Sequence, residues 1–149
     1  MLIKPVSLLL LSLFALPLSA ADPPAASGDD GAKLTLYRVS GSLGGMVGHT
    51  FSIDGKRLAK LKTKSYTSVK LSAGQHQLCM KNTSLCLSLE FEPGAHRIIR
   101  ASNFANANAF VSKLEEVSLD RANKDAKTDT GSEAGVTGYV FVKPEVDDL

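Results

Sequence analysis

The sequence predicts a mostly β protein, a single antiparallel β-sandwich of about seven strands with one short C-terminal helix. Between Lys33 and Ala101, apolar runs of roughly five to seven residues alternate with turn signals about every 8–12 residues, as in sandwiches and barrels. The dipeptide Asp54-Gly55 joins two such runs, and Asp-Gly favours the type I′ turn of a hairpin. Two later runs alternate apolar and polar residues in a common register. Together these observations indicate an antiparallel fold.

The expected strands follow one another along this region. Tight turns are expected at Ser72-Ala73-Gly74 and at Glu92-Pro93-Gly94, where Gly and Pro supply the required backbone angles. In the hairpin around Asp54-Gly55, Phe51 is expected to face Leu58 on the inner side. The expected strands cover residues 34–39, 49–53, 56–61, 66–71, 75–80, 85–91 and 96–101.

The two cysteines belong to the pair of runs with the clearest register. If residues 81–84 form the loop, Cys79 lies opposite Cys86 on the polar face, at a non-hydrogen-bonded position where Cα atoms approach closely. A disulfide there contributes roughly 2–3 kcal/mol in the chain-entropy model. A slip of one residue would destroy the apolar inner face of this pair. That face comprises His76, Leu78, Met80, Leu85, Leu87 and Leu89.

After Ala101 the sequence pattern is compatible with more than one secondary structure. Residues 110–117 fit either a strand, which we favour, or the first turns of a helix. Ser118 is expected to cap a short helix over residues 119–126, and residues 127–149 are expected to be a polar linker and a β-prone tail. The tail either docks as an edge strand or stays free to add to another sheet through Tyr139, Val140, Phe141 and Val142.

The first 21 residues predict export. Lys4 precedes an apolar run over residues 6–16, Pro17 interrupts it, and the small residues Ser19-Ala20-Ala21 follow, which is the order of a signal peptide. The run of about eleven residues is too short to span a bilayer core of roughly 30 Å. We expect cleavage near Ala20 or Ala21. No Cys follows to carry a lipid anchor.

Length and charge limit the number of domains and the kinds of partner that we expect for this chain. Residues 22–32 form a polar lead-in, and residues 33–126 suffice for one domain. The formal charge of the 149-residue chain is +2 and falls to +1 when Lys4 is removed with the signal peptide. Without a basic stripe there is no electrostatic case for a nucleic-acid partner. The mature protein is expected to be periplasmic or secreted, with no transmembrane anchor.

The histidines and serines give little support for catalysis. His49, His76 and His96 lie on different expected strands and lack the His-x-His or His-x-x-x-His spacing of a metal site. The serines form no Gly-x-Ser-x-Gly elbow, and the neighbouring residues Glu115 and Glu116 point to opposite faces of a strand. We therefore expect no catalytic residues, no metal site and no cofactor.

A glycine-rich loop is the candidate binding surface. A phosphate loop requires a helix after its glycines, whereas a strand is expected here, so an inter-strand binding loop is the better interpretation. Its candidate residues are Gly41, Gly44, Gly45, Gly48 and His49.

Several turn and packing positions resemble one family pattern. The chain is similar there to small exported bacterial β-sandwich domains of unknown function that share the turn pattern of PEGA surface domains. The resemblance implies the fold and supplies no binding or catalytic residues. It rests on Tyr37-Arg38, Ile53-Asp54-Gly55-Lys56, Leu61, Ser65-Tyr66, Leu71-x-x-Gly74-x-His76, Pro93-Gly94 and Lys113–Val117.

The expected function is that of an exported, non-enzymatic envelope module that binds a protein, a glycan or peptidoglycan. One alternative is a small metal-dependent or hydrolytic periplasmic enzyme built on converging histidines. Another is an inhibitor or chaperone-like protein that acts by strand addition through its tail.

Overall fold

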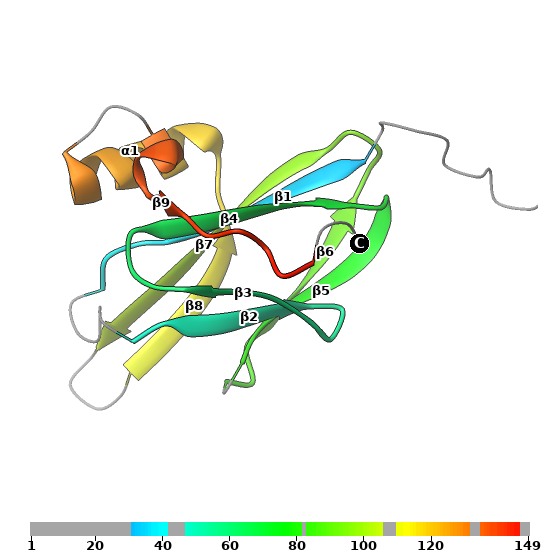
Figure 1. Cartoon of the computed structure of the whole chain (residues 1–149), viewed down its shortest axis with the longest axis horizontal. Helices are drawn as coiled ribbons and strands as arrows, with labels where there is room; N and C mark the ends of the chain where they lie inside the picture. The colour runs from blue at the N-terminus through cyan, green and yellow to red at the C-terminus, as the bar shows by residue number, and fades with distance from the viewer. Residues whose placement is uncertain (1–30, 42–46, 82, 106–109, 132–134, 147–149) are drawn as a thin grey trace, which may run out of the picture.

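The computed structural model describes residues 31–41, 47–81, 83–105, 110–131 and 135–146. The expected signal peptide and nearly all of the lead-in lie outside this part of the chain. Within it, nine strands form two sheets, accompanied by one α-helix, α1, and a 3-10 turn, η1 (Figure 1). None of its helices is long and apolar enough to cross a membrane. The elements are β1 (Ala32–Arg38), β2 (His49–Ile53), β3 (Lys56–Leu61), β4 (Ser65–Leu71), β5 (Gly74–Met80), β6 (Cys86–Phe91), β7 (His96–Ala105), β8 (Phe110–Glu116), α1 (Leu119–Thr130), η1 (Gly135–Gly138) and β9 (Val140–Phe141).

The two sheets form a sandwich, as the sequence predicts. One sheet has the order β8-β7-β1-β4-β9 and the other the order β3-β2-β5-β6. The expectation of a strictly antiparallel fold is wrong at two pairs, because β1 runs parallel to β7 and β4 runs parallel to β9. Both parallel pairs join segments far apart in the chain, so no hairpin turn dictates their direction.

The main core lies between the sheets, and a second, smaller cluster lies between α1 and the outer face of the five-stranded sheet. Because side chains alternate between the two faces of a strand, β1 contributes to both clusters. Leu34 and Leu36 belong to the main core, and Tyr37 belongs to the second cluster. The helix contributes Ala122 and Ala126, one turn apart and fully buried, so it packs closely on the sheet.

The β2–β3 hairpin confirms the predicted turn and corrects its register. Asp54 and Gly55 have φ angles of 50° and 78°, as a type I′ turn requires. Phe51 pairs with Ala59 and not with Leu58, because Leu58 is an extra residue in a β-bulge. The bulge lets Leu58 and Ala59 both be fully buried, which strict alternation does not allow.

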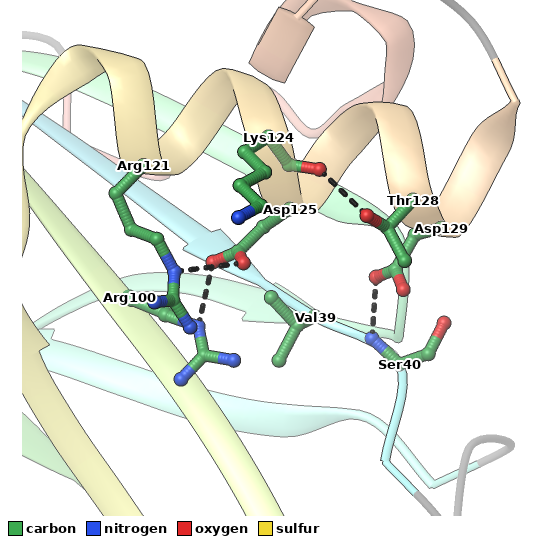
Figure 2. A pocket seen from close by; sticks show the side chains of 8 residues that line it. All are labelled: Val39, Ser40, Arg100, Arg121, Lys124, Asp125, Thr128 and Asp129. Carbon is green, nitrogen blue, oxygen red and sulfur yellow. Dashed lines mark hydrogen bonds and ion pairs between the residues drawn. The ribbon is translucent and has the colours of Figure 1, made fainter.

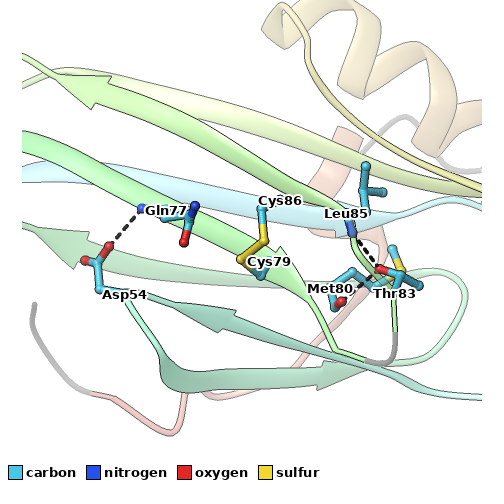
Figure 3. The surroundings of a disulfide bond; sticks show 7 residues. All are labelled: Asp54, Gln77, Cys79, Met80, Thr83, Leu85 and Cys86. Carbon is cyan, nitrogen blue, oxygen red and sulfur yellow. Dashed lines mark hydrogen bonds between the residues drawn. A yellow bond between two sulfur atoms is a disulfide. The ribbon is translucent and has the colours of Figure 1, made fainter.

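The β5–β6 hairpin has the predicted register, with Cys79 opposite Cys86 and the two sulfurs joined in a disulfide (Figure 3). The Met80 amide donates to the Leu85 carbonyl at 3.0 Å, and the Cα atoms of the cysteines are 4.1 Å apart. This is the close, non-hydrogen-bonded type of cross-strand position. Leu87 is only partly buried because β6 is the edge strand of its sheet.

The C-terminal part of the chain is more ordered than expected. Residues 110–116 form a strand, so the helical alternative is wrong there. Ser118 caps α1 by accepting a hydrogen bond from the Arg121 amide. The helix continues to Thr130, where Gly131 ends it with a φ of 69°, so residues 127–130 are helix and not linker. Lys127 and Thr128 are exposed, whereas Asp129 and Thr130 are half-buried, so polar residues occupy this last turn without entering the core.

The tail docks on its own domain. The amides of Val140 and Val142 donate to carbonyls of Lys64 and Tyr66 beside β4, at 2.9 and 2.8 Å. The Glu145 amide then donates to the Leu58 carbonyl of β3, so the tail runs from one sheet to the other (Figure 1). The side chains of Val142 and Val146 pack against the main core.

Candidate functional site

A cavity of about 240 Å³ opens where α1 crosses the outer face of the five-stranded sheet (Figure 2). Three lining residues come from the sheet side: Arg100 belongs to β7, and Val39 and Ser40 directly follow β1. Every other lining residue comes from α1, where spacings of three and four place them on one side of the helix. They are Arg121, Lys124, Asp125, Thr128 and Asp129.

Asp125 joins the two arginines of the cavity. Its Oδ1 accepts a hydrogen bond from Nε of Arg121 at 3.0 Å, and its Oδ2 accepts one from the Tyr37 hydroxyl at 2.8 Å. Nε of Arg100 lies 2.8 Å from the same Oδ2 (Figure 2). The Asp125 side chain is only 13% exposed. Both of its oxygens are therefore already engaged, and its charge is shared between two guanidinium groups.

Asp129, the second carboxylate of the cavity, also accepts two hydrogen bonds. Its Oδ2 accepts hydrogen bonds from the Ser40 amide and from the Tyr139 hydroxyl, both at 2.8 Å. The rings of Tyr37 and Tyr139 stack with their centroids 6.0 Å apart. Burial, and then the bonds to the carboxylates, raise the pKa of both tyrosines, so they stay protonated donors.

The cations of the cavity have more donors than the protein uses. Arg100 also binds Glu115, at 2.7 Å, but its Nε–H is not aimed at Asp125 and has no hydrogen-bond partner in the described part of the chain. Arg121 bonds only through Nε among the described residues, and the Lys124 ammonium has no partner there. Guanidinium and ammonium groups with unused N–H donors bind carboxylate and phosphate oxygens.

The glycine-rich loop that the sequence singles out begins next to this cavity. Gly44 and Gly45 lie outside the described residues, while Gly41 directly follows Ser40. His49 opens β2, where its Nε2 accepts a hydrogen bond from Nδ2 of Asn103 at 2.7 Å. Burial and the charge of Arg38 lower the pKa of His49, so its ring is neutral at pH 7.

The three histidines bind separate partners. His49 contacts Asn103, and Nε2 of His96 lies 2.9 Å from the Thr35 hydroxyl. His76 is bonded on both sides, through Nδ1 to Asp54 at 2.6 Å and through Nε2 to the carbonyl of Ser72. The described residues contain no group of three or more His, Cys, Asp or Glu placed to hold a metal ion.

The four tail residues proposed for strand addition differ in how far they are buried. Tyr139 is buried beneath α1, and Val142 is partly buried against the core. Val140 and Phe141 form β9 and are 69% and 51% exposed. The segment thus adds a strand within its own chain, to β4.

Sequence reasoning missed the cavity. A usable signal was present, because Arg121, Lys124, Asp125 and Thr128 recur at helical spacing beside the face that carries the small residues of α1. Arg100 gave no such signal, since only the β1–β7 pairing places it under the helix.

Comparisons of the chain with family models, with curated proteins and with solved structures found no match. The resemblance to PEGA-like domains stays a prediction.

Proposed function

We propose that the protein is an exported, non-enzymatic binding module that holds a small oxyanion, a carboxylate or phosphate group, in the cavity between α1 and the five-stranded sheet. One observation carries this proposal. Three cationic side chains line the cavity; Asp125 uses only Nε of Arg121 and lies against Nε of Arg100, and Asp129 accepts its hydrogen bonds from Ser40 and Tyr139. The unused N–H donors of Arg100, Arg121 and Lys124 favour an anionic ligand.

Binding fits the site better than catalysis does. General acid–base catalysis needs a group that changes its protonation near neutral pH. The titratable groups of the lining are Arg100, Arg121, Lys124, Asp125 and Asp129, and both aspartates are held by hydroxyl, amide or guanidinium donors. Neither carboxylate is therefore free to accept a proton from a bound substrate.

Export is part of the proposal. The disulfide between Cys79 and Cys86 is compatible with an oxidising compartment, and the first 21 residues have the pattern of a signal peptide. An envelope ligand with an anionic group, on a glycan, on peptidoglycan or on a protein, suits this setting.

Titration calorimetry with inorganic phosphate at low ionic strength tests the proposal. The protein with Arg121→Gln and Lys124→Gln loses two charges from the cavity rim, and we expect a roughly tenfold or greater loss of affinity. The protein with Lys56→Gln and Lys81→Gln is the matched control, because it also loses two exposed charges but none from the cavity lining. Equal affinity for all three proteins, or no phosphate binding by the wild type, contradicts the proposal.

A further inference from the structure

We infer that docking of the C-terminal strand β9 and binding of an anion in the cavity are thermodynamically coupled, with Tyr139 as the positioning residue that links them. The inference rests on the proposed function, since it concerns the regulation of the same site.

Tyr139 connects the two features directly. It immediately precedes β9, and its hydroxyl donates to Oδ2 of Asp129 at 2.8 Å. The same oxygen accepts the amide of Ser40, a residue of the cavity wall. When the tail undocks and Tyr139 moves away, Asp129 loses one of its two hydrogen-bond donors. The Asp129 side chain is then held less firmly, and so is the Ser40 amide that it binds.

A second connection passes through the ring of Tyr139. The ring is 4% exposed and stacks on Tyr37, whose hydroxyl donates to Asp125. Asp125 in turn binds Arg121 and lies against Arg100. Displacement of Tyr139 therefore removes the packing that positions the carboxylate between the two arginines.

β9 lies at the edge of its sheet and is an exposed part of the tail. Val140 and Phe141 of β9 are each more than half exposed, whereas Val142 and Val146 after them are partly buried against the main core. Segments with few buried apolar contacts open at low free-energy cost. Since coupling is reciprocal, an anion that prefers the ordered cavity must also favour the docked tail by the same factor.

Hydrogen exchange measured at individual backbone amides reports how much phosphate binding stabilises the docked tail. With saturating inorganic phosphate, exchange at Val140 and Val142 is expected to slow by roughly three- to tenfold, the range of one hydrogen bond. The amide of Met80, which donates to Leu85 in the other sheet, is the internal control and stays unchanged. Phosphate binding without any change at the two tail amides overturns the coupling and leaves the binding site standing.

Tyr139→Phe tests the positioning role of the hydroxyl. This variant keeps the ring that stacks on Tyr37 and removes the donor to Asp129, so phosphate affinity is expected to fall by roughly three- to tenfold. Tyr66→Phe changes another tyrosine beside β9 that is outside the cavity lining and leaves the affinity unchanged. Equal affinity for Tyr139→Phe and the wild type overturns the inference.

A third measurement tests, without phosphate, the link between the cavity wall and the tail on which the coupling depends. Asp129→Asn, in protein without phosphate, weakens the acceptor for Tyr139 and is expected to speed exchange at Val140 and Val142 by at least threefold. Unchanged exchange at both amides overturns the coupling, whatever the outcome of the calorimetry.

Discussion

Asp54→Asn should destabilise the protein by about 1–2 kcal/mol at pH 7. Asp54 occupies the first central position of the β2–β3 turn, with a φ of 50°, which Asn also tolerates. Its Oδ1 accepts the Gln77 amide, and its Oδ2 lies 2.6 Å from Nδ1 of His76. The substitution therefore keeps the turn and removes the charge opposite His76.

The magnitude follows from the burial of the two partners. A hydrogen bond to a charged group contributes roughly 1.5–3 kcal/mol, and the His76 side chain is only 7% exposed. The Asp54 side chain is 39% exposed, so solvent screening reduces the expected loss to about 1–2 kcal/mol. For a domain of this size, the melting temperature falls by about 4 °C per kcal/mol.

The difference between the two proteins should become smaller in acid. Burial opposes ionisation of Asp54, but bonds from the Gln77 amide and from His76 outweigh it and lower the pKa of Asp54 below 3.8. The contribution of the carboxylate is therefore fully present above pH 3.8 and is lost as the pH falls through the lowered pKa. The loss caused by Asp54→Asn shrinks over the same acidic range.

Urea denaturation of the two proteins at pH 7 and at several acidic values measures this. Glu90→Gln is the control, since it neutralises an exposed carboxylate on β6 and is expected to change stability by less than about 0.5 kcal/mol. Equal midpoints at pH 7, or a difference that persists unchanged in strong acid, would refute the role given to Asp54.

Three further perturbations test the fold. Replacing Cys79 and Cys86 together by Ser should cost about 2–3 kcal/mol and make stability insensitive to dithiothreitol, which urea denaturation with and without reductant checks. Gly55→Ala should cost roughly 1 kcal/mol from its positive φ alone, because an added Cβ meets nothing within 4 Å, and the same assay measures it. Leu34→Ala in the core should cost about 2–5 kcal/mol by thermal unfolding, whereas Phe104→Ala, at a position 44% exposed, should cost far less.

Local chemistry explains which elements could be predicted. The turn at Asp54-Gly55 could be predicted because both residue types tolerate the positive φ angles that a type I′ turn needs. The alternation around Cys79 and Cys86 permits one register, which the structure confirms. The same reasoning failed at Leu58, because a bulge is an exception to alternation and no short-range pattern marked it.

Two features were not predictable from local pattern. Gly131 ends α1, yet the polar residues before it are compatible with either a linker or an exposed helix face. The candidate cavity requires Arg100 of β7 to lie beneath α1, and this depends on the parallel pairing of β7 with β1.

The sequence by itself determined the strands from β1 to β7, the Asp54-Gly55 turn, the disulfide register and the β-sandwich class, because each depends on residue type and on spacing over a few positions. Tertiary structure alone decided the parallel pairs, the docking of the tail on β4 and the convergence of Arg100, Arg121 and Asp125. Those features join residues far apart in the chain, and the burial and charge pairing that select them exist only once both sheets and α1 have packed.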